Sequence, residues 1–476
     1  MKKFWKKNWI SAKKSFRRVI LMGRLFGTDG VRGVVNEELS PELALRLGMA
    51  IGTFFGKGSR ILVGRDVRAG GEMLKSAVVA GLMACGVKVY DAGLTPTPAL
   101  QYVVKADGFD GGVMITASHN PPEYNGIKVI DADGIELPRD KEEVVEELYF
   151  TMRFKRVSWR SLVYSLEKYP YVNEKYVKAV LSHVDKELIK SRGFRVLIDP
   201  ANSVGSITSP WVARELGVKV YTINGDLDPT FSGRPPEPTV ETLRDTVKTV
   251  KALSVDFAIA HDGDADRAII VDDKGRVQWG DRTAAILAKY LALKHRDLPR
   301  RVFTAVSSST LIEDILKPIG VEVVWLKVGS IGIARELVKH GGICGFEENG
   351  GFMYPLHHPV RDGAMTLALL LQLLAEEKRK LSELYDELPQ YYTIKTKIHM
   401  SRDVAWKVVD LVKEAYKNYR QITIDGVKVI TNDFWFLVRP SGTEPLLRIM
   451  IEAKTRDKAE ELLKDIKGLA EEVLGK

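Results

Sequence analysis

Hydrophobic and polar positions follow the same order in three separate stretches of the chain. Each stretch has a basic residue, an apolar strand, a polar loop, a helix, then Gly-Val and a second apolar strand. The three copies run from Arg60 to Tyr90, from Arg195 to Tyr221 and from Arg301 to Val324. Each copy predicts a βαβ unit, because two parallel strands need a crossover that is usually a helix. We therefore expect three similar α/β domains.

Between these units the spacing predicts helices with one apolar face. Apolar residues recur at i, i+3 and i+4 in two such segments, which contain Leu43, Leu47, Ala50 and Ile51, and Val240, Leu243, Val247 and Val250. A helix of this kind buries its apolar stripe against a neighbouring layer. The near-continuous apolar strands are typical of parallel strands that are covered on both faces.

After about Leu388 the pattern changes. It predicts a strand over 392–400, a helix over 404–419, a strand pair around Asp425-Gly426, a strand over 434–438 and a closing helix. Strands separated from helices in this way indicate a smaller α+β domain. The predicted division is an extension over 1–21 followed by three mixed α/β sandwich domains and the α+β domain, over 22–157, 158–274, 275–388 and 389–476.

Composition narrows the class of protein. The 476 residues are 45% hydrophobic and 28% charged, which excludes disordered, collagen-like and membrane-spanning chains. The two cysteines, Cys85 and Cys344, cannot form a disulfide framework and do not belong to a C-x-x-C metal motif. A reducing, cytoplasmic location is the expectation.

The net charge of +9 is concentrated in the first 21 residues, which carry eight basic residues and no acidic one. The rest has 63 basic and 62 acidic residues, so nucleic-acid binding is not expected of it. The extension has no apolar run long enough to span a membrane. We interpret it as a dispensable segment upstream of Met22; the alternative is a surface-binding arm, because Trp5, Trp9 and Phe16 lie among the charges.

The strongest chemical motif is Asp262-Gly263-Asp264-Ala265-Asp266-Arg267, which lies between two apolar strands. Three alternating carboxylates repel one another unless a hard divalent cation neutralises them, so the motif predicts a Mg²⁺ site. An EF-hand is excluded, because Arg267 stands where its loop needs glycine and Asp273 where it needs glutamate. A solvated acidic turn is the alternative.

A second motif, Thr116-Ala117-Ser118-His119-Asn120-Pro121-Pro122, directly follows the apolar strand 112–115 and continues to Lys128. A serine at the carboxyl end of such a strand lies where α/β domains bind ligands. Ser118 is therefore a candidate nucleophile, although no glycines flank it as in a G-x-S-x-G elbow. In isolation, such a serine is more often a turn or cap residue.

Two further loops predict ligand contacts. Arg439-Pro440-Ser441-Gly442-Thr443-Glu444-Pro445, with Arg448 beyond it, offers backbone N–H groups, hydroxyls and a guanidinium to a phosphate, or forms a polar hairpin turn. Gly345-Phe346-Glu347-Glu348-Asn349-Gly350-Gly351 offers acceptors and donors to vicinal sugar hydroxyls. We interpret His357 and His358 as surface or core residues, with proton transfer as the alternative.

Taken together, these four motifs, one per predicted domain, resemble the α-D-phosphohexomutase superfamily. The resemblance extends to Phe26-Gly27-Thr28-Asp29-Gly30-Val31-Arg32-Gly33 and covers the chain from about Met22 onward, most closely matching archaeal phosphomannomutase/phosphoglucomutase and phosphoglucosamine mutase types. It implies three similar α/β domains and a different fourth one around a central cleft.

The resemblance also implies residue roles. Ser118 would carry a phosphoryl group, and Mg²⁺ would be held by Asp262, Asp264, Asp266 and an oxygen of the Ser118 phosphate. The sugar hydroxyls would be read by Glu347 and Asn349, and the non-reacting phosphate would be held by Arg439, Ser441, Gly442 and Thr443. The reacting centre and substrate pocket would be lined by Arg32, His119, Lys128, Arg267, Gly329 and Ser330, with Lys128 or His119 as general base.

This chain departs from many relatives at two positions. Asn349 is followed by Gly350-Gly351, where many relatives have serine and Gly-His, and Ser330 stands where some have histidine. The acid and base roles of those histidines cannot be transferred to this chain.

The implied activity is interconversion of hexose 1-phosphates and 6-phosphates through a hexose 1,6-bisphosphate, which also acts as activator. Glucose and mannose, plausibly glucosamine, are the expected sugars; the alternatives are a dedicated phosphoglucosamine mutase and a metal-dependent sugar phosphatase. The expected partner is a phosphosugar. Nucleic-acid binding and a membrane span are not expected, and the chain is expected to be a monomer or homodimer. An intermediate bound in two orientations should be read at its equatorial 3- and 4-hydroxyls, so galactose phosphates should react slowly.

Overall fold

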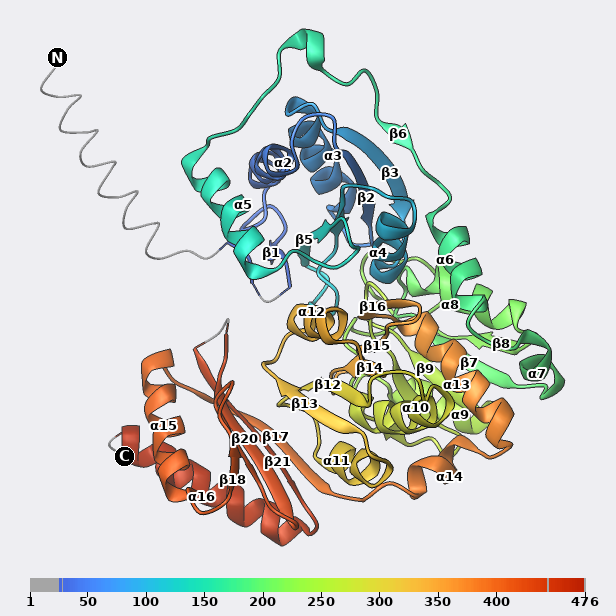
Figure 1. The fold of residues 1–476 in the computed structure, drawn as a ribbon, viewed down its shortest axis with the longest axis vertical. Coiled ribbons are helices and arrows are strands. Elements are labelled where there is room, and N and C mark those ends of the chain that lie inside the picture. The colour runs from blue at the N-terminus through green and yellow to red at the C-terminus, as the bar shows by residue number, and fades with distance from the viewer. Residues whose placement is uncertain (1–24, 28, 443–444, 475–476) are drawn as a thin grey trace, which may run out of the picture.

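The chain forms four β-sheets, one after another along the sequence, in a computed structural model (Figure 1). The structure describes residues 25–27, 29–442 and 445–474. The extension over 1–21 lies outside the described residues. In Figure 1 the first domain lies at the top and the fourth at the lower left, with the third in the middle and the second, in green, to the right.

The first sheet is mixed, with strand order β1-β5-β4-β2-β3-β6. Its strands are β1 (Val31–Val34), β2 (Arg60–Arg65), β3 (Lys88–Leu94), β4 (Gly111–Ile115), β5 (Tyr124–Asp131) and β6 (Glu167–Lys168). Its helices are α2 (Pro41–Phe55), α3 (Gly71–Ala84), α4 (Thr97–Ala106) and α5 (Arg139–Thr151). Side chains alternate along β2, so that Ile61 and Val63 pack with α2 and α3 while Leu62 packs with α4.

The second sheet has the order β11-β10-β9-β7-β8. Its strands are β7 (Arg195–Asp199), β8 (Lys219–Thr222), β9 (Phe257–Ala260), β10 (Ile269–Asp272) and β11 (Val277–Gln278). The helices are α6 (Val172–Leu181), α7 (Lys186–Ser191), α8 (Gly205–Glu215) and α9 (Arg244–Leu253). The predicted helix around Val240 begins only at Arg244, and Val240 itself is exposed, so its assignment to the apolar stripe was wrong.

The third sheet has the order β13-β12-β14-β15-β16. Its strands are β12 (Arg301–Ala305), β13 (Glu322–Leu326), β14 (Cys344–Phe346), β15 (Phe352–Tyr354) and β16 (His358–Arg361). The helices are α10 (Gly280–Lys294), α11 (Leu311–Leu316), α12 (Ser330–His340), α13 (Gly363–Glu377) and α14 (Leu381–Asp386). Each of the three sheets contains its predicted parallel pair, β2 with β3, β7 with β8 and β12 with β13.

The fourth sheet is antiparallel throughout, in the order β17-β21-β20-β19-β18. Its strands are β17 (Tyr392–His399), β18 (Arg420–Ile422), β19 (Val427–Ile430), β20 (Phe434–Pro440) and β21 (Leu446–Ala453), with helices α15 (Arg402–Ala415) and α16 (Arg456–Leu474) packed on it. The sequence pattern missed β21. Its polar residues, Arg448 and Glu452, break the apolar run, and it is recognisable as a strand only through pairing with the distant β17 and adjacent β20.

The first three domains share buried surface. One apolar cluster contains side chains from α4, α6, α8, α10 and α13. Close packing of this kind fixes the relative positions of the loops at the domain junctions. No helix in the described part of the chain is long and apolar enough to cross a membrane. The exact domain boundaries stay predictions.

Candidate active site

The loops that follow β4 and β9 meet between the first and second domains. Ser118, three residues after the end of β4, donates a hydrogen bond of 2.6 Å from Oγ to Oδ2 of Asp262, two residues after the end of β9. Ser118 is buried and has a positive φ of 51°, an unusual backbone conformation for serine. The loop thus holds the hydroxyl against the acidic loop of the other domain.

A buried arginine that the sequence analysis did not identify holds this conformation. The Arg68 guanidinium donates to the backbone carbonyl groups of four residues in and beside the serine loop, Ser118, Asn120, Pro121 and Tyr124. Asp66 accepts from Arg68 Nε at 3.1 Å and from the Thr116 hydroxyl at 2.6 Å. The sequence did contain a signal for these two residues. Asp66 and Arg68 directly follow a predicted parallel strand, at the edge of the sheet where α/β domains place functional residues.

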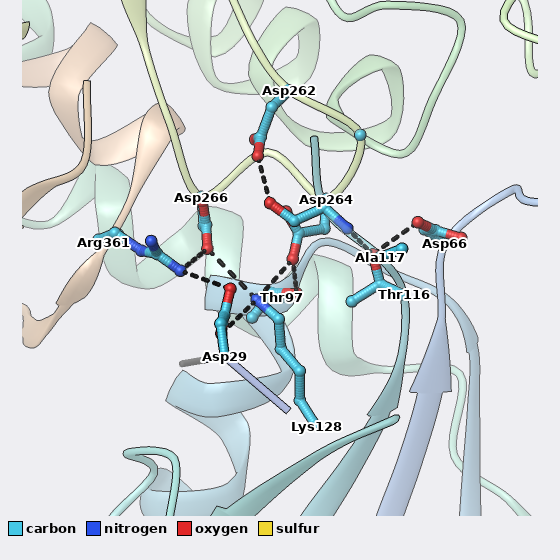
Figure 2. Close-up of polar contacts among 12 residues, drawn as sticks. Asp29, Asp66, Thr97, Thr116, Ala117, Lys128, Asp262, Asp264, Asp266 and Arg361 are labelled. Atoms are coloured by element: carbon cyan, nitrogen blue, oxygen red, sulfur yellow. Dashed lines mark hydrogen bonds and ion pairs between the residues drawn. The ribbon is translucent and has the colours of Figure 1, made fainter. Parts of the chain in front are cut away.

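Three buried aspartates form a group that could hold a metal ion (Figure 2). Carboxylate oxygens of Asp262, Asp264 and Asp266 lie within 4.8 Å of one another. The Oδ1 atoms of Asp264 and Asp266 are buried and have no hydrogen-bond partner among the described residues. Burial, together with the charges of Asp266 and Asp264, raises the pKa of Asp262 to about 7. Mutually repelling carboxylates, two of which have an oxygen that accepts no hydrogen bond from the described residues, fit a hard divalent cation.

Lys128, on β5, points into this acidic group (Figure 2). Its Nζ lies 3.0 Å from Asp264, 3.3 Å from Asp29 and 3.5 Å from Asp266. Although burial opposes it, these three carboxylates raise the pKa of Lys128 well above its ordinary value. The surroundings therefore favour the charged ammonium, which offsets part of the negative charge of the aspartates.

Arg361, at the end of β16, is a second residue that the sequence analysis did not identify. It joins the three aspartates, here called the metal group, to the loop over 345–351, here called the sugar loop. Its guanidinium lies 2.6 Å from Asp266, 3.3 Å from Asp29 and 3.3 Å from Glu347. One buried cation thereby links the first, second and third domains. In the sequence, Arg361 could have been identified from its position at the end of a strand, before Asp362-Gly363. Only the fold shows which carboxylates it contacts.

Arg32, His119 and Arg267 also lie at this centre. Arg32 donates to the Asn120 side chain at 2.6 Å and to the Ala117 carbonyl at 3.1 Å. His119 Nδ1 lies 3.4 Å from Ser118 Oγ, and the nearby Arg267 charge, together with burial, lowers the pKa of His119. The imidazole is therefore held in its neutral form.

The sugar loop reaches the centre through Glu347. Its Oε2 pairs with Arg361, while Asn349 accepts a hydrogen bond of 3.2 Å from the Gly351 N–H. Gly329 has a φ of 139°, and Ser330 begins α12 directly after it. Ser330, Arg361 and Asp266 line part of one narrow space. Ser330 of the predicted 329–330 segment therefore lies near the metal group.

The predicted phosphate loop lies on the fourth domain, at the end of β20. Arg439 pairs with Asp425 at 3.1 Å, and the Ser441 N–H donates to the Leu446 carbonyl at 2.7 Å. Gly442 is described, whereas Thr443 lies outside the described residues. The structure thus brings most predicted residues to one centre and leaves the phosphate loop on a separate domain.

Comparisons with known proteins agree with this arrangement. Models of phosphoglucomutase/phosphomannomutase domains I, II, III and the C-terminal domain match residues 23–156, 174–275, 279–392 and 394–469. A phosphoglucosamine/phosphogalactosamine mutase of Sulfurisphaera tokodaii is 55% identical over 94% of this chain and 100% of its own. A phosphoglucomutase/phosphomannomutase of Thermococcus kodakarensis is 45% identical over 95% of this chain and 100% of its own.

A solved structure is also similar. The crystal structure of a phosphoglucomutase/phosphomannomutase family protein from Burkholderia thailandensis has a TM-score of 0.84 and 25% sequence identity, and covers 94% of this chain and 97% of that one. Because the match covers 94% of this chain, it is not confined to the three repeated domains.

Proposed function

Because this chain belongs to the phosphoglucomutase/phosphomannomutase family of the α-D-phosphohexomutase superfamily, we propose that it interconverts hexose 1-phosphates and 6-phosphates through a phosphoserine at Ser118. The chain is a phosphohexomutase, an isomerase that transfers a phosphoryl group. The proposal extends to the sugar, to the identity of the metal and to the role of each site residue.

The observation that carries the proposal is the contact between Ser118 and Asp262. A hydroxyl in a strained loop, 2.6 Å from one of three mutually repelling carboxylates, is placed where a phosphoryl group on Oγ would share a cation with them. Asp262, Asp264 and Asp266 would hold Mg²⁺, which when bound neutralises charge on the transferring phosphoryl group. The unpartnered oxygens of Asp264 and Asp266 support this fit.

The reaction consists of two phosphoryl transfers, one from Ser118 and one back to it. The bond between Ser118 Oγ and phosphorus breaks as the free sugar hydroxyl bonds to phosphorus. The proton of that hydroxyl passes to a base, which returns it to the departing Ser118 oxygen. We assign that base to His119, because it lies 3.4 Å from Ser118 Oγ, and assign charge neutralisation to Lys128, which pairs with three carboxylates. The hexose 1,6-bisphosphate then binds in the opposite orientation and returns its other phosphoryl group to Ser118.

Glu347 and Asn349 are the proposed sugar contacts, and Arg439, Ser441, Gly442 and Thr443 the proposed contacts to the non-reacting phosphate. The names of the two relatives support glucose, mannose and glucosamine as substrates. The name of the 55% identical relative includes phosphogalactosamine, whose 4-hydroxyl is axial. That name argues against the expectation that an axial 4-hydroxyl is disfavoured. Galactosamine phosphate is therefore the most informative substrate for the role of this loop.

The test is to supply glucose, mannose, glucosamine and galactosamine 1-phosphates separately, with Mg²⁺ and trace hexose 1,6-bisphosphate, and to measure 6-phosphate and free phosphate. We expect 6-phosphate from the first three, with kcat/KM values within about 100-fold, and slower turnover of galactosamine phosphate. Equal rates for glucosamine and galactosamine phosphates would contradict the proposal that Glu347 and Asn349 select an equatorial 4-hydroxyl. Free phosphate as the main product would instead indicate the phosphatase alternative.

Ser118→Ala tests the phosphoryl carrier. The variant should fold normally and lose mutase activity, because only a hydroxyl is removed. Intact-mass measurement should find a phosphate adduct on the wild-type chain, treated with the bisphosphate, that the variant lacks. Retention of full activity by Ser118→Ala would contradict the assignment.

A further inference from the structure

The Asp425-Gly426 turn between β18 and β19 connects the fourth domain with the third. Asp425 Oδ2 lies 3.1 Å from a terminal nitrogen of Arg439, and the same oxygen accepts a hydrogen bond of 3.1 Å from the Val328 N–H. Arg439 begins the proposed phosphate loop, and Val328 directly precedes Gly329 and Ser330. A single carboxylate oxygen therefore contacts both proposed substrate-binding segments.

The turn is built to lie against Arg439. Gly426 has a φ of 87°, which disfavours any side chain. A Cβ atom there would also lie 2.4 Å from the Val438 carbonyl oxygen and 2.7 Å from Arg439 Cβ. Glycine at this position lets the turn approach the arginine backbone closely enough for Asp425 to reach the guanidinium.

Arg439 keeps donors available for a ligand. Its side chain is 14% exposed, and its Nε is buried without a hydrogen-bond partner among the described residues. The Asp425 contact uses one terminal nitrogen, so the other terminal nitrogen, which has no partner among the described residues, remains for an anion. A guanidinium held at one corner presents the others in a defined direction.

Further contacts fix the two domains around this turn. Lys428, on β19, is fully buried, donates to the Ser308 carbonyl of the third domain and lies 3.8 Å from the ring centroid of Trp325. Arg420, on β18, pairs with Glu313 of α11. The strands on both sides of the turn are thus attached to the third domain.

We propose that Asp425 is a positioning residue for the mutase reaction. It orients Arg439 toward the non-reacting phosphate and ties that phosphate site to the 328–330 segment, so that both ends of the substrate are held at a set separation. This inference rests on the proposed function, since it requires Arg439 to bind phosphate.

Removal of the Asp425 charge has two opposing effects. The guanidinium loses its orientation, which weakens phosphate binding, while loss of a nearby negative charge favours an anion. The carboxylate is 18% exposed, so solvent screens its long-range effect more than its direct contact with Arg439. Loss of orientation should therefore dominate.

Asp425→Asn keeps an acceptor for the Val328 N–H but removes the ion pair. We expect KM for glucose 1-phosphate to rise about tenfold with kcat changed less than about twofold, because the non-reacting phosphate is bound equally in the ground and transition states. Asp425→Glu, which restores the charge, should recover part of the loss. Calorimetric titration of the Ser118→Ala chain with glucose 1-phosphate, with and without Asp425→Asn, should show the same weakening without turnover.

A double-mutant cycle with Arg439→Ala separates this inference from the proposed function. If Asp425 acts through Arg439, Asp425→Asn should raise KM no further in the Arg439→Ala background. The matched control is Asp433→Asn on the β19–β20 turn, whose exposed carboxylate pairs with Lys454, and it should leave KM unchanged.

The outcomes are distinct. If Arg439→Ala raises KM but Asp425→Asn leaves it unchanged or lowers it, Asp425 does not position Arg439 and the proposed function stands. Additive effects in the cycle would likewise overturn the coupling. If Arg439→Ala leaves KM unchanged, the phosphate role of Arg439 is wrong, and the inference about Asp425 falls with it.

Discussion

At the scale of single residues, Arg68 is the clearest example of a side chain whose importance lies in the backbone that it holds. Its four carbonyl acceptors lie in the loop that carries Ser118 and at the start of β5 directly after it. Arg68→Lys keeps the charge, but an ammonium with three donors cannot reach all four carbonyls. Because small misplacement of a reacting group can cost about 100-fold in rate, we expect kcat to fall by about that factor.

Steady-state kinetics and the thermal midpoint of Arg68→Lys would check this prediction. Arg153→Lys is the matched control, since Arg153 is exposed and contacts only Glu147 and the Thr151 hydroxyl through its guanidinium in the described part of the chain. A normal kcat in Arg68→Lys would show that the serine loop holds its conformation without this arginine.

Asp264 combines two roles that a substitution can separate. Its Oδ2 accepts from Thr97 and pairs with Lys128, while its Oδ1 is unpartnered. Asp264→Asn removes one ligand charge, so the affinity for Mg²⁺ should fall by about tenfold or more. Metal titration of the apoprotein by calorimetry measures this directly, with Asp297→Asn, an exposed aspartate, as control. Unchanged metal affinity would leave Asp264 with a structural role only.

At the scale of elements, α2 and α3 pack through glycine. A Cβ atom on Gly81 of α3 would lie 2.4 Å from the Leu45 carbonyl oxygen and 2.7 Å from the Met49 N of α2. Gly81→Ala gains about 1 kcal/mol of helix propensity, but overpacking a tight contact costs about 1–3 kcal/mol. Since the backbone of α2 cannot move aside cheaply, we expect net destabilisation.

Gly468→Ala in α16 is the opposite case, because a Cβ there would meet nothing within 4 Å. This variant should be stabilised by about 0.5–1 kcal/mol through the same gain in propensity. Thermal or denaturant unfolding of the two variants compares the effects. A stabilised Gly81→Ala chain would mean that the two helices are packed less closely than the structure shows.

At the scale of the whole molecule, buried histidines lie where domains meet. His358 Nε2 bonds the Gly134 carbonyl of the first domain at 3.1 Å, and His357 stacks on Tyr102 of α4 at a centroid distance of 4.9 Å. Of the two interpretations of these residues, surface or core, their burial supports core. Burial lowers the pKa of His358 to about 3.

This pKa predicts how stability depends on pH. In the unfolded chain the pKa of histidine is about 6.5, so between about pH 6.5 and pH 3 the unfolded state binds more protons. Stability contributed by His358 is therefore complete above pH 6.5 and decreases as the pH falls, by about 1.4 kcal/mol per pH unit at most. The thermal midpoint should fall between pH 7 and pH 4.5.

His358→Gln, which keeps a donor but does not titrate in this range, should show a flatter dependence. His340→Gln, at an exposed histidine of α12, should retain the wild-type slope. The same slope in all three proteins would assign the acid sensitivity to other groups.

The sequence by itself determined the local structure, and it predicted the chemistry of each loop. Periodicity identified the βαβ units at Arg60, Arg195 and Arg301, because strand and helix repeats depend on neighbours a few residues apart. The alternating aspartates of 262–266 predicted a metal group, because mutual repulsion is a local property that the residue order already states. The order of motifs was enough to identify the superfamily.

Only the tertiary structure decided which loops meet and what supports them. β21 is defined by strand pairing, and Arg68, Arg361 and Asp425 owe their positions to partners that lie 50 to 332 residues away or on another domain. An arginine or aspartate in a polar loop has the same sequence signal whether it is solvated or buried. Its partners are set by how the domains pack, since ion pairs and hydrogen bonds depend on distances that local periodicity does not encode.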